Sequence, residues 1–205
     1  MHDYFSQSSA EQRRHHLLAE ADDYRLAKAT RTSPYEGPVP RVRDVIWAEG
    51  TLLNVRPIAG DDSDRLSRLF GRLSPRSIQL RFFSPIRRMS RAQLARLVEV
   101  DHASREALVA LSNDEIIAVA RYDAADRSTG EAEIAATVED SWQNRGVGMR
   151  LTRRLSTLAV ARGCDTFVAS ILPDNRAALS LVRALSPATS VRWSGGTYEA
   201  SIPLV

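Results

Sequence analysis

The chain has 205 residues, 43% of them hydrophobic, which suits one domain with a short appendage. Its net charge of +3 is small and its charges are interspersed, so neither a nucleic-acid nor a membrane partner is indicated. A single cysteine, Cys164, excludes a disulfide framework, no Cys/His cluster has zinc spacing, and no apolar run nears the roughly 20 residues of a membrane span, so we expect a cytoplasmic protein without a metal.

Residues 1–45 differ in pattern from the rest of the chain, which we assign to a domain over 46–205. Ser8 or Ser9 is suited to cap a helix over 10–30, and a proline-rich linker follows it. We expect this helical arm to pack on the domain or on a second copy, which would make a homodimer. A partly ordered tail is the alternative.

From residue 51 onward the pattern is mixed α/β. A strand over 51–57 precedes a helix that opens at Asp61-Asp62, and Pro75 after Ser74 favours a second helix start. The remaining elements are read in the same way: a helix over 89–98, strands over 107–111, 116–122 and 131–138, a helix over 149–161, a parallel strand over 165–171, a helix ending near 185, and a hairpin of 191–193 with 197–204.

The stretch Gln143-Asn144-Arg145-Gly146-Val147-Gly148 lies between the strand over 131–138 and the helix over 149–161. Its two glycines permit a tight turn and leave backbone N–H groups uncovered at a helix start, where an anion binds. Met149 and Arg150 after Gly148 exclude a Walker A loop, and Leu151 replaces the third glycine of the dinucleotide fingerprint. Leu151, Leu155 and Leu158 form the apolar face of the helix, and Arg150, Arg153 and Arg154 lie on the other face.

This Gln-x-x-Gly-x-Gly loop, with its preceding strand and following amphipathic helix, resembles the acyl-CoA pyrophosphate loop of the GNAT N-acetyltransferases. The resemblance implies a mixed, mostly antiparallel sheet with a splayed central pair of parallel strands and flanking helices. It also implies acetyl-CoA as the acyl donor, with its pantetheine arm on the backbone of the strand and its pyrophosphate on the loop. The implied cofactor-binding residues are Ala136, Thr137, Val138, Gln143, Asn144, Arg145, Gly146, Val147, Gly148, Met149, Arg150 and Asn175.

Two further segments resemble the GNAT domains of bacterial protein lysine acetyltransferases. One is Leu73-Ser74-Pro75, continuing to Arg81-Phe82-Phe83, and the other is Ala132-Glu133-Ile134-Ala135. The second resemblance implies that Glu133 is the general base, which a lysine ammonium with a pKa near 10.4 requires. Alternation places Glu133 on the same strand face as Thr137, and shielding from water there would make its carboxylate a stronger base. Glu131 is the competing position.

The resemblance implies transfer of an acetyl group to a protein lysine by direct attack in a ternary complex. A small-molecule amine is the alternative acceptor. A module that binds acyl-CoA without turnover is another alternative, because Val182 stands where many family members have the tyrosine that protonates the departing thiolate. Asn175 is also suited to cap the last helix. The pair Asp101-His102 is a weaker candidate for the acceptor site.

Overall fold

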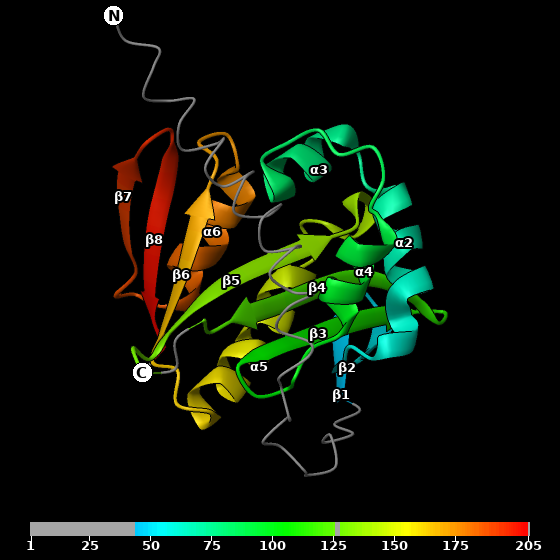
Figure 1. Cartoon of the computed structure of the whole chain (residues 1–205), viewed down its shortest axis with the longest axis horizontal. Helices are drawn as coiled ribbons and strands as arrows, with labels where there is room; N and C mark the ends of the chain where they lie inside the picture. The colour runs from blue at the N-terminus through cyan, green and yellow to red at the C-terminus, as the bar shows by residue number, and fades with distance from the viewer. Residues whose placement is uncertain (1–43, 126–127, 205) are drawn as a thin grey trace, which may run out of the picture.

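A computed structural model of the protein describes residues 44–125 and 128–204. Its eight strands form one sheet in the order β1-β2-β3-β4-β5-β6-β8-β7 (Figure 1). All neighbouring pairs are antiparallel except β5 and β6, which run parallel. The strands are β1 (Asp44–Ala48), β2 (Thr51–Pro57), β3 (Arg105–Ser112), β4 (Glu115–Asp123), β5 (Glu131–Val138), β6 (Thr166–Ile171), β7 (Ser190–Ser194) and β8 (Thr197–Pro203).

Helices cover both faces of this sheet. The first three lie on the face nearer the viewer in Figure 1, and the last two lie on the opposite face. In chain order they are α2 (Ser63–Arg72), α3 (Pro75–Phe82), α4 (Arg91–Val98), α5 (Val147–Ala161) and α6 (Arg176–Leu185), with short 3-10 turns at Gly60–Asp62 and Asp140–Trp142. The expected mixed sheet with one parallel pair and flanking helices is therefore confirmed.

The sequence analysis missed strand β1. Its residues pair with β2 from Asp44 opposite Val55 to Ala48 opposite Thr51, across a turn at Glu49 and Gly50. The boundary expected after residue 45 places Asp44 and Val45 in the arm, and the sequence pattern assigns no element to the residues from there to Ala48. The alternation of exposed Val45 and Trp47 with buried Ile46 and Ala48 was the signal for a strand. Residues 1–43 of the expected arm lie outside the described residues.

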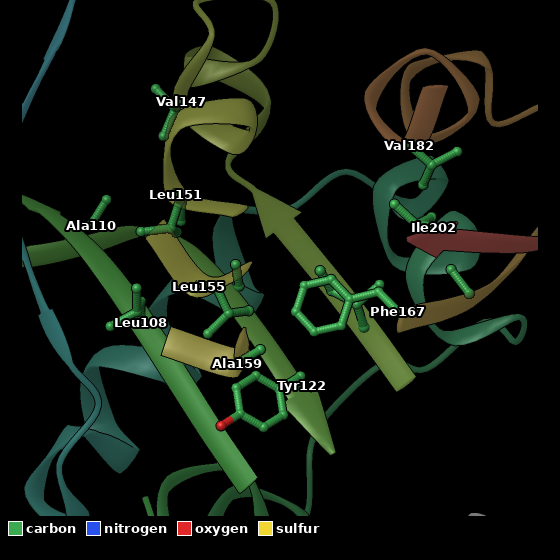
Figure 2. Packing of buried hydrophobic residues seen from close by; sticks show 14 of the residues in the cluster. Leu108, Ala110, Tyr122, Val147, Leu151, Leu155, Ala159, Phe167, Val182 and Ile202 are labelled. Carbon is green, nitrogen blue, oxygen red and sulfur yellow. The ribbon is translucent and has the colours of Figure 1, made fainter. Parts of the chain in front are cut away.

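Helix α5 fills one face of the sheet. Leu151, Leu155 and Ala159, at helical spacing, are buried and point toward β3 and β4, where they meet Leu108 and Tyr122 (Figure 2). The expected apolar stripe is thereby confirmed, although Leu158 is only partly buried. Because α5 is fixed along its length, the loop that begins it is held at a defined place on the sheet.

The opposite face is covered by α2, α3 and α4. Leu66, Leu69 and Phe70 of α2 pack with Ile78 of α3 against Val109 and its neighbours in the sheet. Phe70 and Phe82 meet edge to face with ring centroids 5.8 Å apart. This layer reaches as far as β5, and no helix among the described residues covers β6, β8 and β7 on this side (Figure 1).

A buried charged group stabilises the α5 face. The Glu106 side chain is 1% exposed and accepts hydrogen bonds from Arg162 Nη1 and His102 Nδ1, both at 2.8 Å. Arg162 Nη1 also lies 3.1 Å from the Tyr122 hydroxyl. Burial raises the pKa of Glu106, but the bonds from His102 and Arg162 outweigh burial and lower it below its ordinary value of 4.5.

We expect Glu106→Gln to lower the free energy of unfolding by about 3 kcal/mol, because it leaves a partly buried guanidinium without its carboxylate. A carboxylate with a lowered pKa stabilises the fold above its ordinary pKa and loses that effect as pH falls through the lowered one. The difference in free energy of unfolding between wild type and variant should therefore be largest at pH 7 and shrink below about pH 4.5. Urea unfolding at several pH values measures it.

Glu115→Gln is the control for this prediction, because Glu115 pairs with Arg68 and Arg72 in a more exposed setting. Its loss should be below about 1 kcal/mol. Equal losses of free energy of unfolding in the two variants would show that the buried Glu106 pair stabilises the fold no more than an exposed pair does.

Candidate acyl-donor and acceptor site

The two parallel strands at the centre of the sheet pair over only part of their length. β5 and β6 are in register at Glu131, Ala132 and Glu133, and pairing stops there. The rest of β5, through Val138, pairs with β4 alone. Its backbone groups on the β6 side are therefore free of sheet partners, and an extended polar chain can bond to them as a strand would.

The predicted donor-binding residues of β5 lie in this unpaired half. Ala136, Thr137 and Val138 are each partly buried. Small side chains suffice, because the backbone supplies the donors and acceptors. Gly148 also keeps this part of the site compact. A Cβ there would lie 3.4 Å from both Val138 and Leu181, and its absence lets α5 and α6 approach the end of β5 closely.

The loop before α5 turns through left-handed backbone at two residues. Asn144 has φ of 59° and Gly146 has φ of 74°, and Gly146 is the N-cap of the helix. The first intrahelical bond runs from Arg150 N to Gly146 O at 3.1 Å. The N–H groups of Val147, Gly148 and Met149 therefore have no intrahelical acceptor, and a helix start of this kind, beside the open edge of β5, is suited to bind an anion.

The arginines around this loop have different roles. Arg150 Nη1 folds back to the Arg145 carbonyl at 3.1 Å, so its charge lies over the helix start. The guanidinium carbon of Arg145 lies 5.1 Å from the ring centre of Trp142, and its Nε lies 3.4 Å from Glu49 Oε2. Arg154 is committed elsewhere, since it forms an ion pair with Asp44. Among these three arginines, Arg150 is the one whose guanidinium folds over the start of the helix.

Gln143 and Asp140 connect the loop to α3. Asp140 Oδ1 accepts from Ser74 Oγ at 2.6 Å and from Ser77 Oγ at 2.9 Å, and Ser74 N donates to Oδ2 at 3.0 Å. Gln143 Nε2 donates to Ser77 Oγ and to Val138 O. This Asp140 network explains the Leu-Ser-Pro segment: Ser74 caps α3 through Ser77 N and fixes that helix to the loop.

We expect Asp140→Ala to lower the free energy of unfolding by about 1 kcal/mol, because three hydrogen bonds in a largely exposed setting are lost. The apparent KM for acetyl-CoA should rise severalfold, because the loop is no longer held against α3. Thermal unfolding and steady-state kinetics measure the two effects. Asp64→Ala, an exposed aspartate of α2, is the control and should leave KM unchanged.

Glu133 lies at the last paired position of β5, where the two strands diverge. Two-residue alternation puts it on the face of Thr137, which the α2–α4 layer covers only in part. The expectation that Glu133 is shielded from water is wrong. Its side chain is exposed, and no described helix covers the neighbouring strand β6 on this side. The carboxylate is accessible to a molecule approaching from that side.

Asn175, Val182 and His102 all make contacts within the fold. Asn175 is the N-cap of α6, with its side chain accepting from Ala178 N at 3.1 Å. Val182 is buried in the core at 4% exposure and offers no proton donor. His102 bonds to Glu106, which shares the α5 face of the sheet with Tyr122. His102 is therefore a structural residue, bound on the face opposite to Glu133.

Within residues 44–125 and 128–204, no group of three or more His, Cys, Asp or Glu side chains is placed to hold a metal ion. The same residues contain no helix long and apolar enough to cross a membrane. The polar groups of the site are backbone amides, arginines and carboxylates. They suit a negatively charged extended ligand next to a proton acceptor.

A sheet that opens between two parallel strands, with an anion-binding helix start beside the opening, defines the class of an acyl-CoA-dependent transferase. Residues 74–185, more than half of the chain, match the Acetyltransferase (GNAT) family. The chain belongs to this family and is an N-acetyltransferase.

Relatives with known names agree with this assignment. Acetyltransferase PA5475 of Pseudomonas aeruginosa is 31% identical over 147 residues, covering 68% of this chain and 78% of that protein. Acetyltransferase Pat of Mycolicibacterium smegmatis is 31% identical over 180 residues, 85% of this chain but 52% of Pat, so the chain spans about half of that relative. The crystal structure of the GNAT domain of S. lividans PAT superposes with a TM-score of 0.73 at 28% identity, covering 82% of this chain and 99% of that one.

Proposed function

We propose that the protein transfers an acetyl group from acetyl-CoA to the ε-amine of a protein lysine, by direct attack in a ternary complex. The observation that carries this proposal is the open edge of β5 next to the bare amides of α5. An acyl-CoA has both matching parts, because its pantetheine arm carries amides that bond as a strand does and its pyrophosphate is an anion.

The residues that would hold the donor are those already described. The backbone of Ala136, Thr137 and Val138 binds the pantetheine arm, and residues 143–150 with Arg150 bind the pyrophosphate. Asn175, the N-cap of α6, is assigned to the donor only by the family resemblance. The bound donor supplies a thioester, whose carbonyl carbon accepts the amine and whose thiolate departs.

Glu133 takes the proton that the attacking amine must lose, directly or through one water. Its position at the point of divergence leaves it next to the open half of β5 and accessible from the uncovered face of β6. The thiolate leaves without a tyrosine donor, since Val182 occupies that place. A thiolate is a tolerable leaving group, so water suffices to protonate it.

The lysine acceptor rests on the two segments that resemble bacterial protein lysine acetyltransferases, Leu73 to Phe83 and Ala132 to Ala135, and on the likeness to Pat and PAT. A test incubates the full chain and acetyl-CoA with lysine-rich proteins or with free amines, measures CoA release, and locates the acetyl group by mass spectrometry. Transfer to protein lysine supports the proposal. Transfer only to free amines shows a small-molecule enzyme, and binding of acetyl-CoA without CoA release shows a non-catalytic module.

A further inference from the structure

A small cavity lies between the α2–α4 layer and strands β4 and β5, on the Glu133 face of the sheet. It has about 30 Å³ of free volume, and most of its wall is apolar, with Phe70 and Phe82 among the side chains. Two arginines also line it, Arg81 from α3 and Arg121 from β4. Thr137, from the open half of β5, closes the wall, so the cavity borders the place where transfer is proposed.

Arg121 is a cation in an apolar setting. It stands opposite Ala135 in the sheet, and its Nη1 donates to the Leu97 carbonyl near the end of α4 at 3.3 Å. Burial, followed by the charges of Arg105 and Arg81, lowers the pKa of Arg121 to about 9. The charge of Asp123 offsets these effects only in part, so this guanidinium is incompletely compensated by its surroundings.

Arg81 is compensated even less. It ends α3, and its guanidinium carbon lies 5.0 Å from the ring centre of Phe82. It makes no hydrogen bond or ion pair with any residue of the described ranges 44–125 and 128–204. Burial lowers the pKa of Arg81, and the charge of Glu133 offsets this only partly. Neither arginine forms an ion pair within the described residues, and guanidinium groups without a counter-ion in a largely apolar wall are unfavourable, so such a site is suited to receive an anion.

We propose that this cavity binds a carboxylate that the acceptor carries close to its amine, with Arg81 and Arg121 as the donors. The inference rests on the proposed function, because it names the acceptor class for the same site. A carboxylate has only three heavy atoms, which suits the small free volume. Its source is either an acidic residue next to the acceptor lysine or the α-carboxylate of a free amino acid, and both offer the planar oxygen pair that guanidinium groups prefer.

The test measures binding of reaction products, so it does not depend on turnover. The full chain is saturated with CoA and titrated calorimetrically with two matched pairs. The first pair is a peptide with Nε-acetyllysine flanked by aspartate and the same peptide with asparagine. The second pair is N-acetylglycine and N-acetylglycinamide. Each pair is repeated with Arg81→Gln and with Arg76→Gln, an exposed arginine of the same helix.

We expect one pair to favour the carboxylate by at least about tenfold in wild type and in Arg76→Gln, and by less than about twofold in Arg81→Gln. The pair that shows the preference identifies the source of the carboxylate. Equal affinities within both pairs, or no binding of any product, overturn the proposal. The preference without any CoA release from acetyl-CoA would instead contradict the proposed function and leave the carboxylate site standing.

Discussion

Replacing Glu133 by glutamine is expected to lower kcat/KM for acetyl transfer about a hundredfold to a thousandfold, while acetyl-CoA binds within about twofold of wild type. Glutamine keeps the size of the side chain but accepts no proton. A lysine amine is protonated at neutral pH, with a pKa near 10.4, and must lose a proton before or during attack. Steady-state kinetics and calorimetric titration with acetyl-CoA measure the two quantities.

Glu131→Gln is the matched control for this substitution. Glu131 lies two residues earlier on the same strand face and is also exposed, but it precedes the point where β5 and β6 diverge. The two variants change net charge identically, so a general electrostatic effect would appear in both. We expect Glu131→Gln to keep kcat/KM within about twofold of wild type, because its carboxylate lies two residues, about 7 Å along the strand, further from the opening.

An unchanged rate in Glu133→Gln, or equal losses in the two variants, would remove Glu133 from the mechanism. A rate that recovers as pH rises would instead support the assignment. At high pH the fraction of neutral lysine grows, and the need for a base falls. The pH profile therefore distinguishes loss of a proton acceptor from a loss of acceptor positioning, which pH would not relieve.

The elements predicted from the sequence are those with strong local patterns. The bounds of β2 and β5 are as predicted, because alternation and flanking turn residues define them. The start of α3 at Pro75 follows from the Ser-Pro pair. Strands β3 and β4 are separated by Asn113 and Asp114, whose positive φ values are typical of a hairpin turn. The tight turn that begins α5 follows from the sequence because its glycines and flanking elements are adjacent in the chain, and binding of an anion there stays a prediction.

The parts that were missed depend on contacts between distant segments. Ser74 and Asp140 are 66 residues apart in sequence, and no local pattern pairs a helix cap with a carboxylate of another loop. In the sequence Arg81 is one residue of the segment that resembles the family. Only the packing of α3 against the sheet shows that its guanidinium has no hydrogen-bond or ion-pair partner in the described part of the chain. The exposure of Glu133 likewise depends on how the helices of the described residues are placed, since none of them covers β6 on this side, and strand periodicity does not encode that placement.

Gly146→Ala is expected to weaken acetyl-CoA binding about tenfold or more, because the substitution changes the helix start that binds the pyrophosphate. Gly146 has φ of 74°, where a Cβ costs roughly 1–2 kcal/mol. The added Cβ would lie 2.4 Å from Arg150 Nη1, so the guanidinium must leave its place over the loop. Both the backbone donors and the cation that favour a diphosphate are then displaced.

Gly163→Ala separates strain from binding, because Gly163 lies just beyond the opposite end of α5 with φ of 88°. A methyl group there would meet no described atom within 4 Å apart from its neighbours in the chain. Both variants should lose similar stability in thermal unfolding, and only Gly146→Ala should lose acetyl-CoA affinity by calorimetry. Similar affinities in the two variants would mean that the helix start does not hold the diphosphate. The open edge of β5 would then be the main contact for the donor, because it does not depend on the loop.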